Sequence, residues 1–86
     1  MKTVTIYTTP WCGYCHRAKA LLTHLQIAFH EIDVSNAPDK RQWLVEVTGQ
    51  RTVPQIFIAE ESIGGCDELH DLHHSGLLKQ RLQDSP

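Results

Sequence analysis

A strand–helix–strand pattern at the start of the chain constrains the fold more than any other feature. The segment Val4–Tyr7 is rich in β-branched and aromatic residues and alternates in polarity, which is typical of a strand. Beyond Pro10, apolar side chains recur at helical spacings of three and four, at Cys15, Ala18, Leu22 and Leu25. Phe29–Val34 then predicts a second strand. Because a helix that joins neighbouring strands makes them parallel with a right-handed crossover, this segment predicts an α/β fold.

The middle of the chain predicts a second helix. Asn36 is a suitable N-cap, and Pro38 and Asp39 suit the first turn. Gly49 is expected to end this helix. The side chains that the helix is expected to bury are Trp43, Leu44 and Val47.

The last part of the chain predicts a hairpin followed by helices. The expected elements are, in order, a strand over Gln55–Ala59, a turn at Glu60-Glu61, a short strand around Ile63, a helix that Asp67 caps after Gly64-Gly65, a break at Gly76, and a last helical turn or two within Leu77–Leu82. The predicted fold class is therefore α/β, with a four-stranded mixed sheet flanked by helices in a single domain spanning residues 1–86.

Composition excludes several classes of protein. The net charge of −2 gives no basic surface for nucleic acid, and no apolar run is long enough to span a membrane. The N-terminus lacks the continuous apolar stretch of a signal peptide, so we expect a cytoplasmic location. Three cysteines do not make a structural disulfide framework, and in a reducing compartment a close pair is typically catalytic or metal-binding.

Cys12 and Cys15 form a C-x-x-C pair at the predicted start of the first helix. Residues three apart share a helix face about 5 to 6 Å apart, which suits a disulfide that can open and close. The free N–H groups at the helix N-terminus favour a thiolate at Cys12, whereas Cys15 lies on the apolar face. We therefore expect Cys12 to be the exposed nucleophile and Cys15 the buried resolving thiol.

Two other chemistries use the same string. A zinc site would need two further ligands, which Cys66 with His70, His73 or His74 could supply. The segment Cys12–His16 also matches the C-x-x-C-H pattern of covalent haem attachment. Both are disfavoured, because the pair opens a strand–helix unit typical of a redox motif and the N-terminus lacks an export signal. His16 is expected to be an exposed helix residue beside the pair.

Three segments in this order resemble the glutaredoxin family. They are YTTPWCGYCHRAKALL, then RTVPQIFI over Arg51–Ile58, and IGGCD over Ile63–Asp67. The resemblance extends from about Thr3 to Leu82 and implies a thioredoxin-like fold. It also implies glutathione as the reductant and as a partner, with disulfide-containing or glutathionylated proteins as substrates.

The resemblance also implies which residues bind glutathione. The implied set comprises Tyr14, Arg51, Thr52, Val53, Pro54, Cys66 and Asp67, with Gln50 as an alternative to Arg51. In the family the peptide before the proline is cis, and the main chain at Val53 pairs with the cysteinyl part of glutathione. The N–H groups around Cys66 and Asp67 take the γ-glutamyl carboxylate, the Asp67 side chain faces the ammonium group, and Arg51 reaches the glycine carboxylate.

Purely structural interpretations of these residues remain open. Val53 and Pro54 can simply begin a strand, Asp67 can be only a helix cap, and Cys66 is expected to be a small packed residue. The cluster formed by His70, His73 and His74 is expected to be a solvated helix face, and Trp43 a core residue.

The function predicted from these patterns is a glutathione-dependent thiol–disulfide oxidoreductase with no tightly bound cofactor, acting as a monomer. One alternative is an iron–sulfur carrier, because some relatives with glycine after the first cysteine, here Gly13, hold a two-iron two-sulfur cluster. In that case Cys12 of two protomers and two glutathiones would be the ligands of a cluster-bridged dimer.

A thioredoxin-like reductase is a further alternative, since Trp11-Cys12-Gly13 resembles the thioredoxin site. The family often has lysine where this chain has Thr9, so Arg51 is expected to do more.

Overall fold

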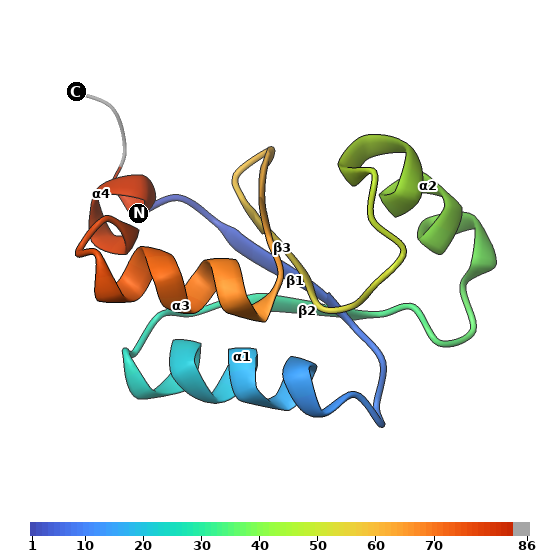
Figure 1. Ribbon diagram of the computed structural model, residues 1–86, viewed down its shortest axis with the longest axis horizontal. Helices are drawn as coiled ribbons and strands as arrows, with labels where there is room; N and C mark the ends of the chain where they lie inside the picture. The colour runs from blue at the N-terminus through green and yellow to red at the C-terminus, as the bar shows by residue number, and fades with distance from the viewer. Residues whose placement is uncertain (84–86) are drawn as a thin grey trace.

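The computed structural model describes residues 1–83, and its elements follow the predicted order (Figure 1). They are β1 (Val4–Thr8), α1 (Gly13–His24), β2 (His30–Asp33), α2 (Pro38–Thr48), β3 (Gln55–Ile58), β4 (Glu61–Gly64), α3 (Cys66–His74) and α4 (Leu78–Leu82). The α/β class with a four-stranded mixed sheet is confirmed within these residues.

The sheet has the strand order β2-β1-β3-β4, so β1 and β3 lie at its centre. β1 pairs with β2 in parallel, as the helical crossover requires, and with β3 in antiparallel orientation. Every residue of β3 is buried, because this strand has neighbours on both edges and helices on both faces (Figure 1).

Two apolar clusters cover the two faces of the sheet. The larger cluster joins β1 and β3 to α1, α3 and α4, and includes Ile6, Leu22, Ile56 and Leu69. The smaller cluster lies on the other face, where Leu44 of α2 packs with Val34 and Phe57. Figure 1 shows α1 and α3 side by side on one side of the sheet, with α2 on the other.

The predicted burial on α2 is wrong for two of its three residues. Leu44 is buried, but Trp43 is 42% exposed and Val47 is 49% exposed. The Trp43 ring packs against the rings of Phe57 and Tyr7, with centroids 5.8 Å apart in both pairs, and the rest of the side chain is open to solvent. The reason is that α2 covers its face of the sheet alone, so no second helix encloses its flanks (Figure 1).

The predicted helix caps also need correction. Ala37, not Asn36, is the N-cap of α2, and it makes no side-chain cap bond because its methyl group has no acceptor; Pro38 occupies the first turn. Gly65, not Asp67, is the N-cap of α3, and Glu68 accepts a hydrogen bond from the Gly65 N–H at 2.9 Å. The predicted helix ends are confirmed at Gly49 and Gly76, which have φ values of 72° and 78°.

Within the described part of the chain, no helix has the length and apolar character that crossing a membrane requires.

Candidate active site

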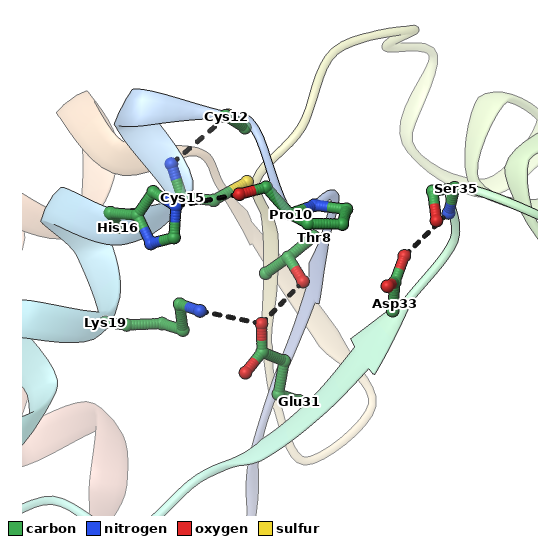
Figure 2. Close-up of polar contacts among 9 residues, drawn as sticks. All are labelled: Thr8, Pro10, Cys12, Cys15, His16, Lys19, Glu31, Asp33 and Ser35. Carbon is green, nitrogen blue, oxygen red and sulfur yellow. Dashed lines mark hydrogen bonds and ion pairs between the residues drawn. The ribbon is translucent and has the colours of Figure 1, made fainter.

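Cys12 is the N-cap of α1 and lies where the helix begins. Its backbone is extended, with φ −95° and ψ 113°, and its Sγ accepts a hydrogen bond from the Cys15 N–H at 3.2 Å (Figure 2). A sulfur that accepts a helix N-terminal N–H is stabilised as the anion, because the donor and the helix dipole both favour negative charge. The Cys12 side chain is half-buried, so a substrate sulfur can reach it.

Cys15 lies one turn further along α1 and is fully buried, at 0% exposure. Burial, followed by a side-chain hydrogen bond with Cys12, raises the pKa of the Cys15 thiol to about 12. The predicted inequality of the two sulfurs is therefore confirmed in its geometry. Cys15 keeps its proton near neutral pH, while Cys12 faces the surface.

The segment before β3 lies directly against the nucleophile. The Cys12 thiol donates to the Val53 carbonyl oxygen at 3.5 Å, although the two residues are 41 positions apart. The Val53-Pro54 peptide bond is cis, which confirms the expectation from the resemblance. Pro54 is buried, whereas Thr52 is exposed and its carbonyl oxygen accepts from the Gln55 side-chain amide at 2.9 Å. The structure thus brings the dithiol and this segment together.

The start of α3 meets the same segment from the other side. A Cβ built on Gly65 would lie 3.2 Å from the Pro54 carbonyl oxygen, so glycine is the residue that permits this close approach. Cys66 is 5% exposed, and burial raises the pKa of its thiol. The predicted packed position of Cys66 is confirmed. Asp67, in contrast, is exposed at the first turn of α3.

The remaining predicted residues lie at the edges of this arrangement. Tyr14 is 57% exposed, and the Arg17 guanidinium carbon lies 5.6 Å from the centre of its ring. Gln50 and Arg51 are exposed and line a shallow cavity of about 250 Å³ that Thr52 and Val53 also line. Residues of α2 line the other side of this cavity, and neither cysteine of the dithiol lines it.

Sequence reasoning missed a polar network beneath the site (Figure 2). Glu31 on β2 accepts hydrogen bonds from the Thr8 hydroxyl at 2.7 Å and from the Lys19 ammonium group at 2.8 Å. The Lys19 hydrogen bond, followed by that of Thr8, lowers the pKa of the Glu31 carboxyl group. The network joins α1 to the two strands on which it packs. In the sequence, Thr8, Lys19 and Glu31 are far apart and share no motif, so no local pattern indicated that they would be grouped.

Two further contacts fix the ends of the site. His16 is exposed, as expected, and its Nε2 donates to the Pro10 carbonyl oxygen at 2.9 Å (Figure 2). Glu68 caps α3 from its third residue, and the spacing of Gly65 and Glu68 matches that of a capping box. That spacing was the available sign that Gly65, rather than Asp67, begins the helix.

The described residues contain no cluster of three or more His, Cys, Asp or Glu side chains that could hold a metal ion. The zinc alternative built on the dithiol therefore lacks the ligand set that it requires. A Cβ at Gly13 would meet nothing within 4 Å, so the fold does not demand glycine there. Residues 1–83 offer one half-exposed cysteine, Cys12, which is the single protein ligand that each protomer of a cluster-bridged dimer would contribute.

Comparisons with known proteins agree with one another. The family model described as glutaredoxin matches residues 4–63. A glutaredoxin of Pseudomonas aeruginosa is 49% identical over 95% of this chain and 98% of its own length. Glutaredoxin 3 of Escherichia coli K12 is 45% identical over 96% of this chain and 100% of its own length. The crystal structure of a buckwheat glutaredoxin–glutathione complex superposes with a TM-score of 0.87 at 34% identity, over 94% of this chain and 76% of that one.

Proposed function

The chain belongs to the glutaredoxin family and is a thiol–disulfide oxidoreductase, and we propose that it takes its electrons from glutathione and exchanges them through Cys12 and Cys15. The observation that carries this proposal is the hydrogen bond from the Cys15 N–H to the Cys12 sulfur at 3.2 Å. It marks Cys12 as the sulfur that the helix N-terminus stabilises as a thiolate, and the thiolate is the attacking form of cysteine.

The first reaction reduces a mixed disulfide between a protein and glutathione. The Cys12 thiolate attacks the glutathione sulfur, a disulfide forms between Cys12 and glutathione, and the protein thiolate leaves and takes a proton from water. A second glutathione thiolate then attacks the glutathione sulfur of this intermediate. Glutathione disulfide leaves, and the Cys12 thiolate is regenerated. Cys15 has no part in this cycle.

The second reaction reduces a disulfide within a substrate protein. The Cys12 thiolate attacks one substrate sulfur, and the other leaves as a thiolate. Cys15 then gives up its proton to that thiolate or to water and attacks the Cys12 sulfur, which releases the reduced substrate. The enzyme is left with a Cys12–Cys15 disulfide, which two glutathiones reduce to the dithiol while forming one glutathione disulfide. Because the pKa of Cys15 is about 12, loss of its proton is a demanding part of this route.

Glutathione itself would bind across the three segments that converge on Cys12. The main chain of Val53, whose carbonyl oxygen lies at the Cys12 sulfur, would pair with the cysteinyl residue as an added strand does. The first N–H groups of α3, around Cys66 and Asp67, would hold the γ-glutamyl carboxylate, and the Asp67 side chain would pair with the ammonium group. Arg51 would hold the glycine carboxylate from the cavity that it lines, and Tyr14 would border the site. Thr52 and Pro54 would shape the segment on which the cysteinyl part rests. The buckwheat glutaredoxin, which was crystallised with glutathione, supports this choice of ligand.

Two cysteine variants test the division of labour. Cys12→Ser should abolish both reactions, because no other half-exposed thiol is available among the described residues. Cys15→Ser should retain reduction of a glutathionylated peptide and lose reduction of a protein disulfide. A folded Cys15→Ser variant that loses both activities would contradict the proposal.

A matched pair of aspartate variants tests glutathione recognition. Asp67→Asn should raise the KM for glutathione. A lost charged contact costs about 1–3 kcal/mol of binding free energy, and the cost here should be smaller because the Asp67 side chain is exposed. Asp71→Asn is the control, because Asp71 is also exposed but lies one turn further along α3. Equal effects of the two substitutions would reduce the role of Asp67 to general surface charge.

Several expectations from the sequence stay predictions. They are the single domain over residues 1–86, the monomeric state, the cytoplasmic location and the lack of a tightly bound cofactor. The iron–sulfur carrier also stays untested.

A further inference from the structure

Two histidines lie one turn apart on α3, a helix that does not carry the dithiol. His70 and His74 occur in the string His70-Asp71-Leu72-His73-His74, and their ring centroids are 6.3 Å apart. Residues four apart lie on the same face of a helix. Paired histidines at this spacing on a helix are a recurring way to bind zinc. A metal–histidine bond of about 2.0–2.1 Å allows two rings this close to reach one ion after small side-chain rotations.

The hydrogen bonding of His70 already fixes the tautomer that a metal ligand needs. Its Nδ1 lies 2.9 Å from the Cys66 carbonyl oxygen. A carbonyl oxygen can only accept, so Nδ1 carries the proton and Nε2 of the neutral ring carries the free lone pair. In metal sites, histidine ligands typically donate their other ring N–H to a carbonyl or carboxylate in this way. His70 is thus oriented before any ion arrives.

The surroundings leave the pair open to an ion. His74 is exposed and His70 is half-buried. The Cys66 sulfur is buried and lies 3.5 Å from Nδ1 of His70, the ring nitrogen that already donates to the carbonyl oxygen, so it lies on the side of the ring away from the free lone pair. Because the described residues offer no cluster of three ligands, water would have to complete the coordination.

We propose that His70 and His74 chelate a divalent transition-metal ion, with Nε2 of His70 and one ring nitrogen of His74 as ligands and water at the remaining positions. Imidazole ligands suit Zn²⁺, Ni²⁺ and Cu²⁺, whereas Mg²⁺ prefers oxygen. This site is separate from thiol exchange and does not depend on it.

The test is calorimetric titration of the full chain with Ni²⁺ after Cys12 has been blocked with iodoacetamide, which removes the accessible thiolate. The blocked protein should bind one Ni²⁺ and should not bind Mg²⁺. His70→Gln and His74→Gln should each weaken Ni²⁺ binding by at least about tenfold. Circular dichroism of each variant, compared with the unsubstituted protein, ensures that lost binding is not lost folding.

His73→Gln is the matched control. The His73 ring lies 5.4 Å from that of His74, but adjacent residues do not share a helix face, and His73 lines a separate cavity with Leu25 and Ile27. This variant should bind Ni²⁺ as the unsubstituted protein does. The proposal is overturned if Ni²⁺ does not bind, if either His70→Gln or His74→Gln binds with unchanged affinity, or if His73→Gln abolishes binding.

Discussion

In the folded protein, Cys15 should react with iodoacetamide far more slowly than it does in the unfolded chain. A rise in the pKa of Cys15 from 9.0 to about 12 lowers its thiolate fraction near neutral pH about a thousandfold. The same rise makes the thiolate about 15- to 30-fold more nucleophilic once formed, because the Brønsted coefficient is about 0.4–0.5. Together the two effects lower the alkylation rate of Cys15 by about 30- to 60-fold. Full burial of the side chain should slow the reaction further, since the reagent must reach the sulfur.

The assay is timed alkylation of the reduced protein followed by peptide mass spectrometry, which measures each cysteine separately. In the folded protein Cys12 should be modified first, and Cys66, which is also buried, should lag as Cys15 does. In denaturant the three cysteines should react at similar rates, which provides the reference for each residue. If folded Cys15 reacts within a small factor of its rate in denaturant, its burial and raised pKa do not control its reactivity. The proposed resolving role would then lose its physical basis.

Three further substitutions test the fold and the site. Leu22→Ala should lower the free energy of unfolding, measured with urea, by about 2–5 kcal/mol, because Leu22 is 1% exposed in the larger cluster; a loss below 1 kcal/mol would contradict that role. Glu31→Gln should lower it by only about 0.5–1 kcal/mol, because the Glu31 and Lys19 side chains are 39% and 24% exposed. The folded pKa of Glu31 lies below its ordinary 4.5, so the stabilisation from the Glu31 carboxylate is complete above pH 4.5 and is lost as the pH falls through the folded pKa. A difference in unfolding free energy between the unsubstituted protein and Glu31→Gln that persists in strong acid would refute the assignment. Gly65→Ala should raise the KM for glutathione several-fold and also lower urea stability, since the added methyl group would lie 3.2 Å from the Pro54 carbonyl oxygen and alanine is a poor N-cap; an unchanged KM would show that this close approach does not matter for binding.

The sequence predicted best those features that a few neighbouring residues determine. Cys12 could be placed at the start of α1 because the apolar spacing begins at Cys15, and the same spacing predicted which sulfur is buried. Gly49 and Gly76 end their helices with positive φ values, a conformation that few other residues adopt. In each case the cause lies within one turn of helix.

Features that depend on distant parts of the chain were predicted less well. Trp43 has the composition of a core residue, but its exposure depends on how many helices cover that face of the sheet. The bond between Thr8 and Glu31 joins residues 23 positions apart, and no local pattern marks it. The cap of α3 was misplaced by two residues, because an aspartate was preferred over a glycine whose place is set by packing against Pro54.

The 41-residue separation between Cys12 and Val53 has a consequence for the protein as it is made. A ribosome releases both thiols of the dithiol well before it releases the segment that borders them and the helix α3 that packs against α1. Until that later half arrives, Cys15 lacks the enclosure that keeps it protonated, and both thiols have the ordinary reactivity of cysteines in an unfolded chain. Selective exchange chemistry therefore begins only after the segment at Val53 and helix α3 have been made.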